Sequence, residues 1–201
     1  QFQDFVNSQD ARNESWQRKF DGDVMARAEP NAGHLAIQKW FGAGKLGGVI
    51  TQNVDNLHQL SGLDEDRIVE LHGNATYASC LSCGARYELS ELRKQFQSHG
   101  EVAPCPLCGG LIKTATISFG QSMPESEMAK AQQMVEACDL LIVLGSSLTV
   151  YPAAGFPQYA KQLGALLVIV NREATDQDHL ADLVIHESIG QVMSAAVIQA
   201  Q

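Results

Sequence analysis

Basic side chains are scarce in this sequence, and long apolar runs are absent from it. Lys and Arg number 14 against 23 Asp and Glu, which gives a formal net charge of −9. A surface of that sign repels the phosphates of nucleic acid and of anionic membranes, although it can attract Lys-rich protein tails. No apolar run approaches the ~20 residues that a membrane-spanning helix needs. We therefore expect neither nucleic acid nor membrane among the partners.

Signals for export are also missing from the start of the sequence. The first residues show no basic stretch followed by an apolar one, which is the pattern of a secretory leader. Gln1 is not a natural first residue, so we expect the sequence to begin within a longer protein. The expected location is intracellular, with the cytoplasm favoured over the nucleus.

Five cysteines are present, and four of them form two Cys-x-x-Cys pairs. Cys80 pairs with Cys83 and Cys105 with Cys108, and 21 residues separate the two pairs. This spacing is close to that of a structural zinc site, in which each pair points two thiolates at one metal ion. Two disulfides or a redox pair are the alternative, but no thioredoxin-like context surrounds either pair. The spacing predicts one structural Zn²⁺, and Cys138, in an apolar run, is expected in the core.

Outside the cysteine-rich stretch, apolar runs alternate with helical periodicity. Residues 1–45 are expected to be helical, with Asn31 capping a helix that ends at Gly42 or Gly44. The expected strands lie at 47–51, 67–71, 116–120, 139–144, 165–170 and 183–185. The expected helices between and after them include 53–60, 152–163 and 189–198. This alternation predicts the α/β class, with a doubly wound, Rossmann-like parallel sheet.

Two of these runs, 139–144 and 165–170, are apolar almost throughout, as in parallel strands buried on both faces. Residues 76–112 depart from the pattern, because turns are dense there and the four paired cysteines lie among them. We expect a small zinc-binding module at 76–112, with a short helix at 90–96, inserted into a Rossmann-like domain formed by 1–75 and 113–201. A core this small would not hold without the metal.

Polar groups follow the first two strands directly. Gln52, Asn53 and Asp55 come after one, and His72 comes after the other. Ligands of open α/β sheets bind outside the carboxyl ends of the strands. Amide, carboxylate and imidazole groups can hold a polyhydroxylated ligand and move one proton. Alternatively, 51–55 is a helix N-cap and His72 a surface histidine, but the two segments together favour a site.

Two later strands end in a similar way, in Gly-Ser-Ser at 145–147 and Asn-Arg-Glu at 171–173. Gly145 would let the backbone approach a ligand closely, and the serines offer hydroxyls and amides. Asn171 or Glu173 could accept hydrogen bonds from ribose hydroxyls, as an acidic residue does in dinucleotide-binding folds. Taken singly, each could be a helix cap.

These motifs together resemble the sirtuins, which are NAD-dependent protein lysine deacylases. The octapeptide TQNVDNLH at 51–58, followed by HGN at 72–74, resembles the family's signature. The segments FGQSMP at 119–124, GSSLTVYPAA at 145–154 and NRE at 171–173 resemble its later motifs, in the family's order. The resemblance covers residues 48–193. It implies an enzyme, an NAD-dependent protein lysine deacetylase or deacylase, whose partner is an acylated-lysine protein or peptide.

The resemblance also implies a mechanism and a set of site residues. The acyl-lysine oxygen would attack C1′ of the NAD ribose and release nicotinamide, with His72 as general base on the ribose hydroxyls. The products would be lysine, nicotinamide and an O-acyl-ADP-ribose. The peptide would lie extended between the loops at Gly120 and Val150. The residues implied to contact NAD are Gln52, Asn53, Val54, Asp55, Gly145, Ser146, Ser147, Asn171, Arg172, Glu173 and Ile189. The zinc would be structural and far from the chemistry.

Two departures from the family matter. Its first strand, Gly-Ala-Gly-x-Ser loop and Pro-Asp-Phe-Arg motif would precede residue 1. Because that loop cradles the pyrophosphate with backbone amides, we expect residues 1–201 alone to bind NAD weakly and a longer parent to be active. Gln121 stands where the family often has an acid, which changes the charge beside the peptide groove. Two other functions stay open: a zinc-containing binding module without catalysis, and an ADP-ribosyltransferase that uses the same NAD site.

Overall fold

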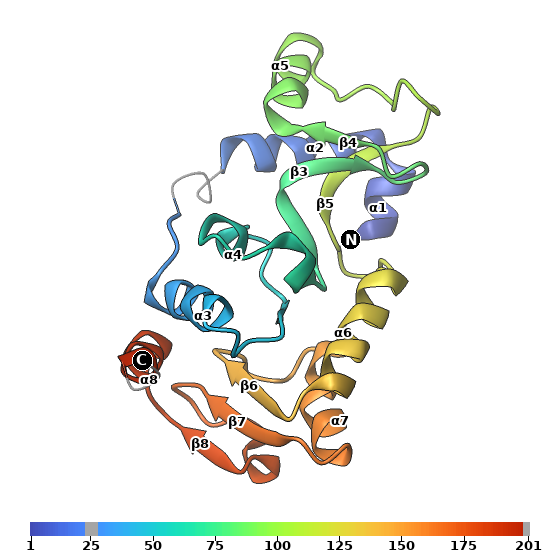
Figure 1. Ribbon diagram of the computed structural model, residues 1–201. Helices are drawn as coiled ribbons and strands as arrows, with labels where there is room; N and C mark the ends of the chain where they lie inside the picture. Colours follow the sequence, from blue (N-terminus) through green and yellow to red (C-terminus); the bar gives the residue numbers. More distant parts are fainter. Residues whose placement is uncertain (23–27, 199–201) are drawn as a thin grey trace. The chain divides into compact units, whose positions relative to one another are not determined.

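The computed structural model describes residues 1–22 and 28–198, and the chain divides into two compact units (Figure 1). The cysteine unit consists of Gln1–Ala28, Gln52–Asn56 and His72–Met123. The sheet unit consists of Glu29–Thr51, Leu57–Leu71 and Pro124–Gln201. The boundaries of these compact units differ from those of the predicted domains. The domain limits therefore stay a prediction.

The cysteine unit contains an antiparallel sheet with strand order β4-β3-β5. Its elements are α1 (Phe2–Asn7), α2 (Gln9–Asp21), β3 (Gly73–Cys80), β4 (Arg86–Glu88), α5 (Leu89–His99) and β5 (Ile112–Thr116). The strand predicted at 116–120 was misplaced, since β5 has already ended at Thr116. The residues after it form a turn instead, in which the backbone N of Gln121 donates to the carbonyl oxygen of Ser118.

The core of the cysteine unit is small and includes sulfur atoms. Its buried members are Trp16, Ala78, Cys80, Leu92, Cys105 and Ile112. Trp16, on α2, is only 2% exposed, and its ring stacks on Phe20 with centroids 5.3 Å apart. Trp16 is thus a core residue, and the partly buried Phe20 packs against the same cluster.

The sheet unit contains the parallel strands of the described residues. Its elements are α3 (Ala32–Gly42), β1 (Val49–Thr51), α4 (Leu57–Leu60), η2 (Glu65–Arg67), β2 (Ile68–Glu70), α6 (Glu125–Ala137), β6 (Leu140–Leu144), η3 (Ala153–Gly155), α7 (Phe156–Gln162), β7 (Leu166–Val170), η4 (Asp178–Leu180), β8 (Leu183–Ile185) and α8 (Ile189–Ile198). Strand β1 pairs with β2 in parallel, and β7 lies between β6 and β8, parallel to both. The predicted α/β class with parallel strands is confirmed.

Helices cover both faces of these strands. Val49 packs in a cluster with Ile37 of α3 and Met193 of α8, whereas its neighbour Ile50 packs with Val135 of α6 and Ala160 of α7. Successive side chains of a strand point to opposite faces, so α3 and α8 lie on one face and α6 and α7 on the other. This is the layering of a doubly wound fold.

Several predicted boundaries hold and others shift. Asn31 caps α3 as expected, with Oδ1 accepting from the backbone N of Gly33 at 2.9 Å, and β8 and α8 begin and end where predicted. The helix expected at 53–60 is shorter, because Asn56 has a φ of +64° and only Leu57–Leu60 is helical. The helix expected at 152–163 begins as the 3-10 turn η3. Among the described residues, no helix is long and apolar enough to cross a membrane.

The expectation that the apolar run at 139–144 is buried on both faces was wrong. Leu140 is 43% exposed, and the rest of β6 is half-buried. Within the part of the chain that the structure describes, β6 pairs only with β7, so its other edge has no neighbouring strand. By contrast, β7 has strands on both sides, and Leu167 and Ile169 are fully buried.

Candidate functional site

The segments that follow β1 and β2 are joined by hydrogen bonds. Thr51 and Glu70 are paired at the carboxyl ends of the two parallel strands, so the residues after them emerge side by side. Three hydrogen bonds join them: Nδ1 of His72 lies 3.1 Å from the carbonyl oxygen of Gln52, the backbone N of Ala75 donates to the carbonyl oxygen of Val54 at 2.8 Å, and Nδ2 of Asn74 donates to Oδ1 of Asn56 at 2.9 Å. Residues 52–56 and 72–75 therefore form one braced platform.

The hydrogen bond of His72 determines its neutral tautomer. A carbonyl oxygen can only accept, so Nδ1 of His72 must carry the hydrogen that it donates to Gln52. In the neutral ring Nε2 then holds the lone pair. The structure thus orients His72 as a proton acceptor at Nε2, which is the chemistry of a general base.

Gly73 allows β3 to start directly after His72. Its φ is +72°, and a Cβ at this position would lie 1.9 Å from the carbonyl oxygen of Ala115 on β5. The backbone N of Ile117 donates to the carbonyl oxygen of His72 at 2.8 Å. No side chain fits between the two strands here, and this close approach fixes the backbone of His72.

The predicted residues beside His72 lie on this platform. Gln52, Val54 and Asp55 are half-buried, and Asn53 is exposed. They follow a strand end and are not a helix N-cap, because α4 begins only at Leu57. The alternative interpretation of residues 51–55 as a cap was therefore wrong.

In the sheet unit, the ends of β6 and β7 bring a second group together. The backbone N of Gly145 donates to the carbonyl oxygen of Val170 at 2.9 Å, so Gly145 lies beside the start of the Asn171 segment. A Cβ on Gly145 would lie 2.7 Å from Cδ1 of Ile189, which places Ile189 next to it. Gly145, Asn171 and Ile189 are thus neighbours in space.

Local hydrogen bonds shape the two loops of this group. Oγ of Ser146 accepts from the backbone N of Leu148 at 3.2 Å, and Oγ of Ser147 lies 2.9 Å from Oγ1 of Thr149. Nδ2 of Asn171 donates to the carbonyl oxygen of Glu173 at 2.7 Å, while the Arg172 and Glu173 side chains are exposed. These bonds hold the loops in open turns that leave hydroxyl and carboxylate groups at the strand ends.

The four paired cysteines converge on one point of the cysteine unit. Their sulfur atoms all lie within 4.8 Å of one another, with Cys80 and Cys108 Sγ 3.5 Å apart and Cys83 and Cys105 Sγ 3.7 Å apart. With Zn–S bonds of about 2.3 Å, neighbouring sulfurs of a tetrahedral site lie about 3.8 Å apart. Disulfide sulfurs would be about 2.05 Å apart, and all five cysteines are free thiols. The donor set and its size fit one zinc ion.

Sequence reasoning missed a tyrosine beside these sulfurs. The hydroxyl of Tyr87 lies 3.0 Å from Sγ of Cys105. Its hydrogen bond lowers the pKa of the Cys105 thiol to about 6, and the same bond raises the pKa of Tyr87 to about 12. A thiolate that accepts a hydrogen bond from an un-ionised phenol is ready to bind a cation. Nothing in the Cys-x-x-Cys spacing points to Tyr87, although it lies on the strand that follows the first pair.

The chain is similar in sequence to known proteins. The sequence model of the Sir2 family matches residues 1–152. The NAD-dependent protein deacetylase of Rhodopseudomonas palustris is 51% identical over 197 residues, covering 98% of this chain and 78% of that protein. The NAD-dependent protein deacetylase 1 of Bradyrhizobium diazoefficiens is 52% identical over 198 residues, covering 98% and 77%.

Solved structures agree over nearly the whole chain. A structure of Sir2 bound to an acetylated peptide superposes with a TM-score of 0.87 at 32% identity, covering 98% of this chain and 81% of that one. A structure of Sir2 with a p53 peptide and NAD⁺ gives a TM-score of 0.86 at 32% identity, covering 98% and 80%. These structures therefore resemble this chain in sequence as well as in fold.

Proposed function

The chain belongs to the Sir2 family, and we propose that it is an NAD-dependent protein lysine deacylase whose general base is His72. It transfers the acyl group of an acyl-lysine side chain to ADP-ribose and releases nicotinamide. NAD supplies the ribosyl group that accepts the acyl group. Relatives named as deacetylases and Sir2 structures with acetylated or propionylated peptides support this reaction.

One observation carries the role of His72. The carbonyl oxygen of Gln52 holds Nδ1 of His72 as a donor, which leaves Nε2 to take a proton from a ribose hydroxyl. The platform of residues 52–56 and 72–75 keeps the ring in this orientation while the proton moves. A surface histidine without a role would need no such platform.

We assign the cosubstrate contacts by the same argument. Gln52, Asn53, Val54 and Asp55 would contact the nicotinamide and its ribose, next to His72. The residues assigned to the adenosine side are Gly145, Ser146, Ser147, Asn171, Arg172, Glu173 and Ile189. The close approach of Gly145 to Ile189 supports placing these two residues in one subsite, because only a residue without a side chain leaves room for Ile189 at this strand end. Val150 would form one wall of the groove for the peptide.

The zinc ion would be structural. Cys80, Cys83, Cys105 and Cys108 supply all four positions of a tetrahedron, which leaves no open position for a substrate. Paired cysteines that bind a metal and do not form disulfides are typical of reducing compartments, and on this ground we infer a location inside the cell, with the cytoplasm favoured over the nucleus.

The test is nicotinamide release from NAD in the presence of an acetyl-lysine peptide. His72→Ala should lower the rate by about 10²–10⁴, the usual contribution of a general base, and lower the free energy of unfolding by only about 1 kcal/mol through the lost hydrogen bond. His99→Ala is the matched control, because His99 is exposed at the end of α5 and its Nδ1 also lies 3.1 Å from a backbone carbonyl oxygen, that of Gln95. Equal rates of nicotinamide release in the two variants would show that His72 is not the general base.

The same assay separates the two other functions. Release that requires the acylated peptide supports deacylation, whereas transfer of label from NAD to a protein supports an ADP-ribosyltransferase. If the protein binds the peptide but carries out neither reaction, it is a binding module without catalysis.

A further inference from the structure

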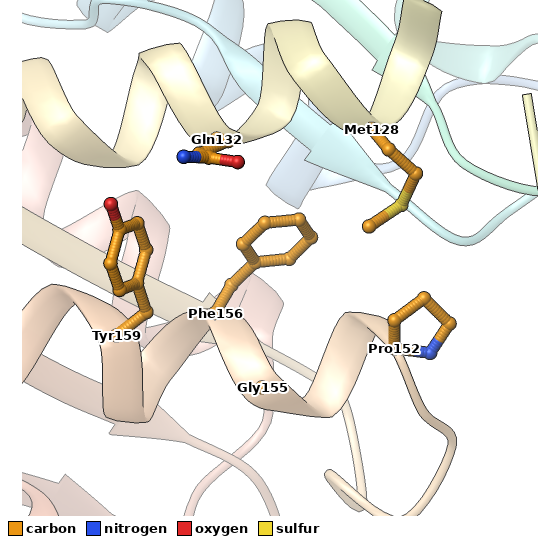
Figure 2. Close-up of a pocket in the computed structure, with 6 residues that line it drawn as sticks. All are labelled: Met128, Gln132, Pro152, Gly155, Phe156 and Tyr159. Atoms are coloured by element: carbon orange, nitrogen blue, oxygen red, sulfur yellow. The ribbon is translucent and has the colours of Figure 1, made fainter. Parts of the chain in front are cut away.

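A groove lies between α6 and α7 of the sheet unit, apart from the residues assigned so far (Figure 2). Its volume is about 260 Å³. The residues that line it are Met128, Gln132, Pro152, Gly155, Phe156 and Tyr159. Met128 and Gln132 are four residues apart on α6, and Phe156 and Tyr159 are three apart on α7, so one stripe of each helix forms a wall.

The groove changes from apolar to polar along its length. Met128 and Pro152 lie at one end, the ring of Phe156 lies in the middle, and Gln132 and the hydroxyl of Tyr159 lie at the other end (Figure 2). A purely apolar ligand would leave the polar end unmatched, and a purely polar one would leave the Phe156 end unmatched.

A carboxylate is hydrogen-bonded to both polar residues of that end. Oε1 of Glu136 accepts from the hydroxyl of Tyr159 at 2.6 Å and from Nε2 of Gln132 at 2.7 Å. These bonds lower the pKa of the Glu136 carboxyl, so the group stays ionised at neutral pH. Within the described chain, no residue donates to Oε2 of Glu136, which leaves that oxygen for a ligand.

We propose that this groove binds an arginine side chain of the substrate protein. The aliphatic stem would lie along Met128, Pro152 and Phe156, and the guanidinium would reach Oε2 of Glu136. Arginine suits both ends, since its stem packs on apolar surface and its planar head stacks on aromatic rings and binds carboxylates. The rings of Phe156 and Tyr159 add a cation–π attraction.

The position of the groove points to the substrate as the source of the arginine, a step that rests on the proposed function. Pro152 is two residues beyond Val150, which we assign to the wall of the peptide groove, and Val150 and Tyr151 are 46% and 70% exposed. A peptide that runs along Val150 would carry a flanking side chain past Pro152. The net charge of −9 favours basic segments over acidic ones.

The test uses acetyl-lysine peptides with otherwise uncharged flanks and a single arginine that is moved one position at a time. The readouts are the Kd from fluorescence anisotropy of the labelled peptide, and KM and kcat for nicotinamide release. At one position the arginine should tighten binding about three- to tenfold and lower KM with kcat unchanged. Glu136→Gln should abolish that gain. Glu127→Gln should keep it, because Glu127 lies on the same helix, carries the same charge and pairs with Lys130 at 2.7 Å.

Three results would overturn the proposal. An arginine that helps equally at every position, or that still helps in Glu136→Gln, would indicate only general attraction to an acidic protein. A leucine that binds as well as arginine at the best position would assign the groove to apolar side chains. A failure of the proposed function would give another result. Nicotinamide release would then be absent, while arginine at one position would still tighten binding in a way that depends on Glu136.

Discussion

The two units of this chain are stabilised in different ways. The sheet unit buries aliphatic side chains between parallel strands and helices on both faces, and Leu167 and Ile169 at its centre are fully buried. The cysteine unit has an antiparallel sheet whose core includes two of its four paired cysteines, Cys80 and Cys105. Burial therefore stabilises the first unit, whereas the second needs four thiolates held together.

This difference matters for function because the proposed base belongs to the cysteine unit. His72 precedes β3, and Cys80 is the last residue of that strand. Eight strand residues span roughly 26 Å, so a metal at Cys80 would be too far from His72 to take part in the proposed reaction. The same strand nevertheless connects the zinc ligand to His72. A structural metal can thus support catalysis by keeping in place the strand on which the base depends.

Removing the metal should have the largest effect on stability and should show the difference between the two units most clearly. We expect chelation, or Cys80→Ser, to unfold β3, β4 and β5 and abolish nicotinamide release, because zinc bound to such sites contributes on the order of 10 kcal/mol to folding. Amide hydrogen exchange should show β3 losing protection while β7 keeps it. Cys138→Ser is the control, since Cys138 lies outside the sulfur cluster. Pure protein without stoichiometric zinc, or unchanged protection of β3, would contradict this account.

Truncating the aliphatic core should have a smaller effect, confined to the other unit. Leu167→Ala removes a fully buried side chain of β7, and we expect the free energy of unfolding to fall by about 2–5 kcal/mol. Leu166→Ala, one residue away and 56% exposed, should stay within about 0.5 kcal/mol of the parent. Denaturant titration measures both, and zinc content should be unchanged. Equal losses in the two variants would mean that β7 is not the centre of the core.

The sequence predicted the sheet unit through periodicity and the cysteine unit through spacing. Alternating apolar runs were enough for the parallel strands, and β8 and α8 were located to the residue. The Cys-x-x-Cys pairs predicted the convergence of the sulfurs. Both signals are local, which is why a single sequence carries them.

The contacts that were missed join segments far apart in the chain. The hydrogen bond from Tyr87 to Cys105 spans 18 residues, and that from Asn74 to Asn56 also spans 18. The exposure of Leu140 in β6 depends on which strand lies beside it, and an apolar run cannot specify its neighbour. The tautomer of His72, on which its role depends, likewise required the position of Gln52.

The smallest predicted effect concerns a buried lysine of β5. Lys113 is 4% exposed, and its ammonium donates to the carbonyl oxygens of Thr114 and Thr116. The β3–β5 pairing shifts register between Gly73 and Ala78, so the ladder between the strands is interrupted at this point. Burial lowers the pKa of Lys113 to about 8. A positive charge is thus buried within β5, the strand that pairs with β3.

That pKa gives the cysteine unit a pH dependence of known sign. Between about pH 8 and 10.5 the unfolded chain binds the proton on Lys113 and the folded chain has lost it, so the free energy of unfolding rises with pH in this window. The cost of burying the charge is fully present below pH 8. In Lys113→Met the rise should be smaller than in the parent, whereas exposed Lys130→Met should keep it. Lys113→Met also loses the hydrogen bonds to two carbonyl oxygens at every pH. The test is therefore the slope of the free energy of unfolding against pH, and not its absolute value. Parallel curves for parent and Lys113→Met would show that the ammonium is as well solvated in the folded unit as in the unfolded chain.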